Sequence, residues 1–327
     1  MKKITILVAT LMAFGFAANA QSSQVSTAAS TYRNPAFTPL APFAPGGVTH
    51  NAAVTGAAAG TPATSYGSYN QDSRVDQSGT HNEAAIDQVD ARSGANAGST
   101  ANLVQSGDYN TATQNQASAG NTGSGRNTMY ATQAGTYSQS NQSQYNVADA
   151  HAQVTQAAGS SANLASQTQS GGSDLSAFIS QTGASSGNHA DQTQSNATFT
   201  TAVAIQNGSN SHSTQSQSGY GNDAGVHQGV GSGNTAMQSQ SGSYLNASIN
   251  QTGALASGNY AKQDQTGYSN NASIEQHSAN NYAQQAQGNN TGTYQNNTSV
   301  IMQNNVSSAA FTSQTGGAYN TVVVNQH

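Results

Sequence analysis

Glutamine and asparagine are the residues whose type and spacing could do chemistry in this sequence, through hydrogen bonding of their side-chain amides. From Gln77 to Gln326 a glutamine recurs at short, nearly regular intervals, and each one closes a seven-residue phrase of the form Asn-x-Ala-x-x-x-Gln, such as Asn222 to Gln228. A glutamine amide both donates and accepts hydrogen bonds, so identical amides stacked at the roughly 4.8 Å spacing of β-strands can join into a ladder. A fixed repeat of this kind predicts a stack of identical structural units.

Side chains suited to metal binding are present but scattered. His151, His189, His212 and His227 fall at position two or six of their phrases, where the side chains of a strand would face solvent. A ladder of metal-binding histidines on that surface is the competing interpretation. Because the chain has no cysteine and no paired carboxylates at ligand spacing, we expect no metal site and no cofactor.

Catalytic patterns are equally hard to find. Serine is abundant, but no Gly-x-Ser-x-Gly elbow lies between a strand and a helix. Asp108 and Asp223 lie in or beside turns, where bonding to the backbone explains them. Tyrosines such as Tyr109 and Tyr220 recur near strand starts, which favours packing along the edge of the coil over a row of sugar-binding rings. We expect no enzyme.

Apolar side chains are too few for a conventional globular core. Leu, Ile, Val and Phe make up about 12% of the 327 residues, below the roughly 20% found in globular chains. Charged residues amount to only 6%, whereas disordered chains usually combine low hydrophobicity with high net charge. The net charge of −5 argues against nucleic acid or an anionic membrane as a partner.

The beginning of the chain reads as an export signal followed by a leader. Residues 1–20 combine Lys2 and Lys3, an apolar run and a small-residue cleavage site ending at Ala20, which predicts a signal peptide and a secreted protein. Residues 21–70 hold all five prolines and predict a mostly disordered leader, either a handle for export or a tolerated terminus. Residues 71–327 carry the repeat, and no further apolar run reaches the roughly 18 residues of a membrane span.

Each phrase predicts a β-strand. Its recurring residue types occupy positions one, three, five and seven, the spacing that places side chains on one face of a strand. The phrases are too short and too rich in glycine, asparagine and serine for helices.

Position five distinguishes two kinds of phrase that alternate along the chain. It is aliphatic in one kind and glutamine in the other, and Ile86 and Thr312 break the rule in glutamine positions. The true repeat is therefore a pair of strands averaging about 25 residues, within the range of solenoids. We predict an all-β fold, a cross-β, amyloid-like solenoid of about ten stacked two-strand coils.

The predicted core ladder contains four groups of residues and is accompanied by turn glycines. Position one contributes Asn110, Asn163, Asn188, Asn222, Asn234, Asn259, Asn270 and Asn281, and position three is represented by Ala112. Position five contributes Gln114, Val154, Gln167, Ile179, Gln192, Val226, Gln238, Ile249, Gln263, Ile274, Gln285, Ile301 and Val324. Position seven contributes Gln116, Gln156, Gln169, Gln181, Gln194, Gln228, Gln240, Gln251, Gln265, Gln276, Gln287, Gln303 and Gln326, and the turn glycines are Gly79, Gly107, Gly135, Gly219, Gly242 and Gly267.

The last phrase, Asn320 to Gln326, is among the most β-prone in the chain. Soluble solenoids usually carry a cap over the open end of the stack, and none is visible in the sequence. We therefore expect end-on addition of further copies.

Two phrases show a family resemblance most clearly. Gln217 to Gln228 and Gln265 to Gln276 resemble the curlin repeat, Ser-x5-Gln-x-Gly-x-x-Asn-x-Ala-x3-Gln, of bacterial curli fibre subunits. The resemblance implies a secreted functional amyloid that passes through an outer-membrane secretion channel, works with accessory chaperones and a nucleator subunit, and forms extracellular fibres at the bacterial surface. The chain departs from the familiar subunits in its larger number of strand pairs and its proline-bearing leader, so major subunit and nucleator both stay open.

Three classes of function follow from this sequence. We expect a structural subunit that assembles into fibres for biofilm matrix, surface adhesion and cell aggregation. The alternatives are a monomeric secreted β-solenoid that binds a ligand, as ice-binding proteins do, and an adhesin stalk. The first alternative would need a regular outward row of threonines, and the second an anchoring or receptor-binding domain.

Overall fold

The computed structural model describes residues 70–90, 98–118, 126–183, 185–253, 255–288, 296–317 and 319–327. The predicted signal peptide and all of the predicted leader before Asn70 lie outside these residues. The described part contains nineteen strands and no helix, and so no helix there has the length and hydropathy of a membrane span.

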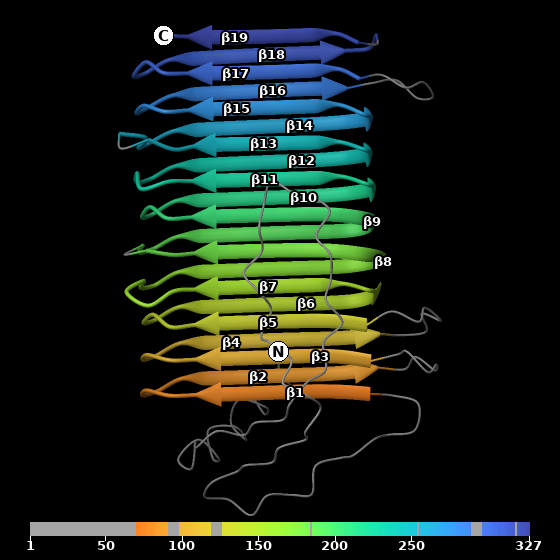
Figure 1. Cartoon of the computed structure of the whole chain (residues 1–327), viewed down its shortest axis with the longest axis vertical. Helices are drawn as coiled ribbons and strands as arrows, with labels where there is room; N and C mark the ends of the chain where they lie inside the picture. Colours follow the sequence, from red (N-terminus) through yellow and green to blue (C-terminus); the bar gives the residue numbers. More distant parts are fainter. Residues whose placement is uncertain are drawn as a thin grey trace, which may run out of the picture.

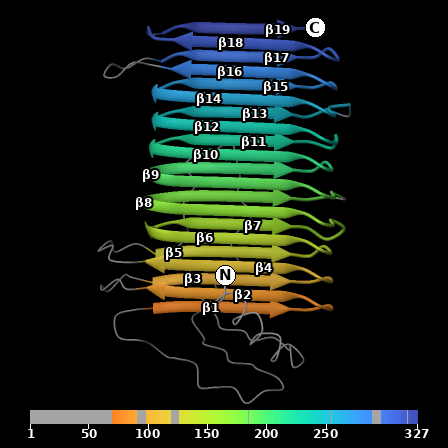
Figure 2. The ribbon, with the colours of Figure 1, turned by 180° about the vertical axis from the view of Figure 1, so that it is seen from behind.

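The strands lie on top of one another in two columns, and successive strands point in opposite directions (Figures 1 and 2). Column A contains β1 (Asn70–Gln77), β3 (Gly98–Gln105), β5 (Arg126–Gln133), β7 (His151–Gln156), β11 (Asp223–Gln228), β13 (Asn246–Gln251), β15 (Asn271–Gln276), β17 (Thr298–Gln303) and β19 (Thr321–Gln326). Column B contains β2 (Glu83–Asp90), β4 (Thr111–Ser118), β6 (Gln139–Ala148), β10 (His212–Tyr220), β12 (Thr235–Ser243), β14 (Tyr260–Tyr268), β16 (Tyr282–Gly288) and β18 (Ala309–Thr315). β8 (Leu164–Gln181) and β9 (His189–Gln206) run through both columns.

Each strand pairs in parallel with the strand of the next coil in the same column, residue for residue. Val226 of β11 aligns with Ile249 of β13, which aligns with Ile274 of β15. In column B, Gln215 of β10 aligns with Gln238 of β12. This arrangement confirms the predicted all-β solenoid.

The middle of the stack differs from the expected turn-separated strands. The sequence predicts a turn after Gln169, yet β8 continues around the edge of the coil and pairs with β9 there, as in Gly172 with Ala197 and Leu175 with Thr200. These bridges at the edge join the two columns into one continuous nineteen-stranded sheet within the described residues. The edge segments 170–174 and 195–199 are equal in length and one residue longer than the segments 218–221, 241–244 and 266–269, where separate strands end and begin, and the two longer backbones stay paired through the edge.

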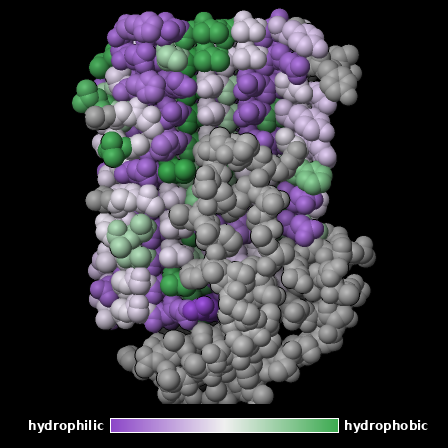
Figure 3. All heavy atoms as spheres, in the orientation of Figure 1, coloured by the Kyte–Doolittle hydropathy of each residue, from purple (hydrophilic) through white to green (hydrophobic). Residues whose placement is uncertain are grey.

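Alternate residues of each strand fill the narrow space between the columns. Aliphatic residues of column A meet alanines of column B, and one buried cluster consists of Val226, Ile249, Ile274 and Ile301 with Ala236, Ala261, Ala283 and Ala310. Because alanine is short, the two sheets can approach closely around a single row of branched side chains. On the face visible in Figure 3, residues of similar hydropathy repeat from coil to coil and form stripes along the stack.

Tight turns reverse the chain between the columns. Gly219 has φ +101°, and a Cβ on it would lie 2.0 Å from the carbonyl oxygen of Gly242 in the next coil. Only glycine fits this approach. The residue before position one of many strands is also left-handed, including Tyr109 (φ 58°) and Tyr244 (φ 56°).

Candidate functional site

The closing glutamines form two continuous amide ladders, one in each column. In column A the Nε2 group of Gln77 donates to Oε1 of Gln105 at 2.6 Å, and the same contact repeats up to Gln303 and Gln326 at 2.9 Å. In column B the ladder runs from Gln88 to Gln314. Every amide donates toward the next coil in the direction of β19, so each ladder has a polarity.

A third ladder lies at position five of column B. Gln114 donates to Gln142, and the contacts continue through Gln167, Gln192, Gln215, Gln238 and Gln263 to Gln285 with distances of 2.7–3.0 Å. Ile86 aligns with Gln114 at one end of this column, and Thr312 aligns with Gln285 at the other. The two exceptions to the sequence rule therefore lie in β2 and β18, the outermost described strands of column B.

Glutamine amides also join the two columns. Gln228 Nε2 donates to Gln251 Oε1, to the His212 carbonyl and to the Asn234 carbonyl, each at 3.0 Å, while Gln228 Oε1 accepts from Gln206 Nε2 at 2.9 Å. Gln228 is fully buried. Because every donor and acceptor of this amide is used, it can lie in the interior without the penalty of an unpaired polar group.

Asparagine side chains at position one make hydrogen bonds to backbone groups where the strands begin. Asn234 Oδ1 accepts from the Asn259 backbone N–H at 3.0 Å, and Asn234 Nδ2 donates to the Ala256 carbonyl at 2.7 Å. The eight predicted asparagines are all buried.

The structure brings the predicted ladder residues together in these columns. Val154, Ile179, Val226, Ile249, Ile274, Ile301 and Val324 lie in one register row of column A. Of the predicted turn glycines, Gly79, Gly107 and Gly135 lie between strands, whereas Gly219, Gly242 and Gly267 lie within the last two residues of β10, β12 and β14. At the end of the stack the packing opens, because Val324 and Gln326 are only half-buried.

No family model and no curated protein matches this chain. The site must therefore be interpreted from its own geometry.

His151 corrects one expectation from the sequence. It was expected to face solvent, but its exposed fraction is 2%. It lies on the outer side of β7, where the Thr128 hydroxyl is 2.5 Å from His151 Nδ1 and the Tyr130 ring centroid is 5.5 Å away. The neighbouring outward residues Tyr130 and Phe178 are also buried, so this part of the outer face is not a solvated surface. Desolvation lowers the pKa of His151 to about 4.

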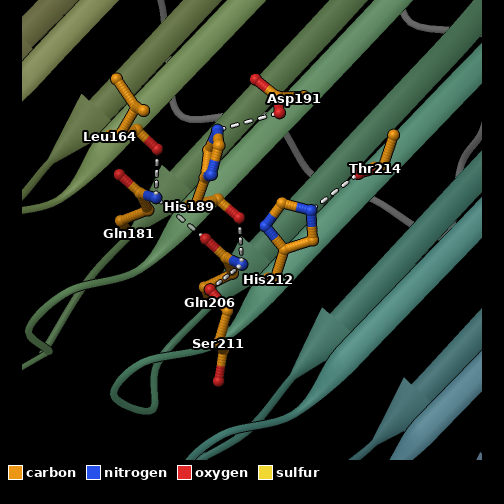
Figure 4. Close-up of polar contacts among 8 residues, drawn as sticks. All are labelled: Leu164, Gln181, His189, Asp191, Gln206, Ser211, His212 and Thr214. Carbon is orange, nitrogen blue, oxygen red and sulfur yellow. Dashed lines mark hydrogen bonds and ion pairs between the residues drawn. The ribbon is translucent and has the colours of Figure 1, made fainter.

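His189, Asp191 and His212 form a cluster that we did not expect from the sequence (Figure 4). His189 and His212 are register partners on β9 and β10, and their ring centroids are 4.7 Å apart. His189 Nε2 lies 2.9 Å from Asp191 Oδ2, and His212 Nε2 lies 3.1 Å from the Thr214 hydroxyl. All three members of the cluster are half-buried, as is His227 elsewhere in the stack.

Electrostatics favour neutral imidazole at His212. Its pKa is lowered by desolvation and by the nearby His189, and the Asp191 carboxylate opposes this shift. Comparing successive phrases position by position would have revealed the cluster. Both histidines occupy position two of successive column B strands, and Asp191 occupies position four. Ligand spacing along the chain could not reveal it, since the histidines are 23 residues apart in sequence.

Aromatic residues stack at the edges of the coil. Tyr220, Tyr244 and Tyr268 follow one another with centroid distances of 5.3 Å, and Tyr109 and Tyr137 stack at 4.8 Å at another edge. These contacts brace adjacent turns, because edge-to-face and stacked rings attract at such distances.

Proposed function

We propose that this protein is a secreted structural subunit that assembles end on into extracellular, curli-like amyloid fibres. These fibres would serve biofilm matrix, surface adhesion and cell aggregation. The observation that carries the proposal is the common polarity of the amide ladders. The β19 end presents the Nε2 group of Gln326, and the β1 end presents the Oε1 atom of Gln77, so the two ends are complementary donor and acceptor surfaces.

The packing at the ends supports the same proposal. Within the described residues β19 pairs only with β17, and β18 only with β16. The side chains of Val322 and Val324 face the space between the two columns but are only half-buried. Ile274 and Ile301, which face the same space from other strands of column A, are fully buried. A strand edge with unsatisfied backbone groups and exposed apolar residues favours the addition of another strand.

The proposal includes an export route, which rests on the resemblance to the curlin repeat. The fibre partners would be further copies of this chain, an outer-membrane secretion channel of the curli type, accessory chaperones and a nucleator subunit. Neither nucleic acid nor a membrane span enters this scheme.

Fibre formation by the chain from residue 21 onward tests the proposal. We expect fibres that bind amyloid dyes, diffract at about 4.8 Å along the fibre axis and grow from added seeds. A soluble monomer whose state is independent of concentration would instead support a monomeric ligand-binding solenoid of the ice-binding or adhesin type.

Two matched substitutions in β19 make the test specific to the end surface. Val324→Lys places a charge in the aliphatic row between the two columns, whereas Val323→Lys places the same charge on the outer face of β19, where Val323 is 65% exposed. We expect seeds to elongate with the Val323 variant and to stall with the Val324 variant, because a buried unpaired charge is costly. Equal elongation of the two variants would contradict end-on growth through this column.

A further inference from the structure

We propose that His189, Asp191 and His212 form a binding site for a divalent transition metal of the zinc or copper class. The ligand atoms of the three residues lie within 4.8 Å of one another. The three side chains lie on the outer face of column B (Figure 4), whereas the backbone carbonyls of His189 and His212 accept from the ladder glutamines Gln206 and Gln228.

The solenoid itself creates the convergence. His189 and Asp191 are two residues apart on β9, so their side chains leave the same face of the strand. Parallel pairing then places His212 directly beside His189, at the roughly 4.8 Å separation of adjacent strands. A metal with ligand bonds of about 2.0–2.2 Å needs only small rotations of these half-buried side chains.

The chemistry of the ligands selects the class of metal. Imidazole nitrogens suit zinc, copper and nickel, whereas calcium and magnesium prefer oxygen ligands only. Two imidazole nitrogens and one carboxylate oxygen make three protein ligands, which leaves coordination positions for water. The Thr214 hydroxyl, which contacts His212 Nε2, helps to orient that ring.

Metal binding at this site would favour the folded coil. Its ligands come from two successive coils, and the unfolded chain does not hold them together. A ligand that binds only the folded state stabilises it by about 2.7 kcal/mol at a free concentration of one hundred times Kd.

Zinc titration of the full chain by calorimetry tests the site. We expect about one equivalent of Zn²⁺ to bind, and His212→Gln and Asp191→Asn each to weaken its affinity at least tenfold. The matched control is His277→Gln, because His277 also lies near a carboxylate, Glu275, at 3.6 Å but has no third histidine or carboxylate ligand close by among the described residues. A second measurement, the guanidinium midpoint with and without Zn²⁺, should shift for the wild type and the control only.

Two results would overturn the metal site. One is the absence of stoichiometric zinc binding by the wild type. The other is an equal loss of affinity in the His277 and His212 variants, which would assign binding to scattered histidines.

A second inference concerns the joint between copies, and it rests on the proposed fibre assembly. Within the described residues column A holds eleven strand segments and column B holds ten, because β8 and β9 contribute to both. A second copy added without rotation would leave a one-strand gap above β18. We infer that each copy is rotated by half a turn about the fibre axis, so that its β1 lies on β18 and its β2 lies on β19.

The residues of the end strands match this rotation. Ile86 of β2 would then lie on Val324 of β19, and Val75 of β1 would lie on Thr312 of β18. A glutamine at position five of β2 or β18 would meet an aliphatic residue across the joint. The two strands that depart from the glutamine rule are therefore the two that a half-turn brings against the aliphatic column.

Engineered disulfides distinguish the two joints, since the chain has no native cysteine. Asn325 and Asp87 are both exposed at position six, and the half-turn places them on adjacent strands at a separation that a disulfide can span. We expect oxidised fibres of the Asn325→Cys, Asp87→Cys variant to yield covalent multimers and those of Asn325→Cys, Asp76→Cys to yield none. The reverse pattern would refute the half-turn and leave fibre assembly standing, whereas failure of the wild type to form fibres would refute the assembly itself.

Discussion

Replacement of Gln228 by glutamate tests whether the buried amide ladders hold the solenoid together. Gln228 makes three donated contacts and one accepted contact and has no exposed surface. Glutamate has nearly the same shape, but its ionised carboxylate cannot donate. It would face the carbonyl oxygens of His212, Asn234 and the Gln251 side chain without a proton between them.

The expected loss of stability follows from these contacts. An unpaired buried charge costs roughly 3–5 kcal/mol, so we expect the Gln228→Glu variant to lose about that much free energy of unfolding at pH 7.5. At acid pH the glutamate becomes protonated and regains one donor. The loss should then fall to about 1–3 kcal/mol, the cost of the remaining unsatisfied groups.

Guanidinium unfolding followed by circular dichroism measures both values on freshly purified chain. The matched control is Gln139→Glu, which introduces the same charge at an exposed position and should change the stability by no more than about 0.5 kcal/mol. An equal loss in both variants, or a loss at Gln228 that does not shrink on acidification, would refute the role of the amide ladders.

Three further predictions concern the core, acid stability and the turns. Ile274→Ala should cost about 2–5 kcal/mol in guanidinium unfolding, because Ile274 is fully buried, and Glu275→Ala on the outer face should cost less than 1 kcal/mol; similar losses would mean that the strand facing is wrong. Burial lowers the pKa of His151 to about 4, so the stability that its neutral form contributes is complete above about pH 6.5. This contribution falls by about 3 kcal/mol as the pH drops from about 6.5 to about 4, because the unfolded chain takes up a proton first. His151→Gln should flatten this part of the pH–stability profile, and an unchanged profile would contradict the burial. Gly219→Ala should lower the thermal midpoint more than Gly159→Ala, because both glycines have positive φ but a Cβ at Gly159 meets no atom within 4 Å; equal midpoints would show that the close approach to Gly242 is relieved without cost.

The amino-acid sequence determined the repeat, the strand facing and the composition of the core rows. A seven-residue phrase with like residues at alternate positions can bury one face only as a strand. Strict recurrence of Gln, Asn and Ala then leaves one stacking register, because a shift of one residue would place the inward amides in water. Residues such as Ile274 and Gln228 were therefore predictable as inward-facing from their phrase positions.

Tertiary structure decided the features that depend on contacts between coils. The passage of β8 and β9 around the coil edge goes with edge segments that match in length and are one residue longer than those between β10 and β15, a relation between coils that no single phrase encodes. The burial of His151 depends on what surrounds the outer face of β7, and the alternating pattern alone predicted the opposite. The polarity of the amide ladders and the meeting of His189 with His212 arise only when one coil lies directly on the next, because hydrogen bonding fixes the spacing and direction of groups that are distant in sequence.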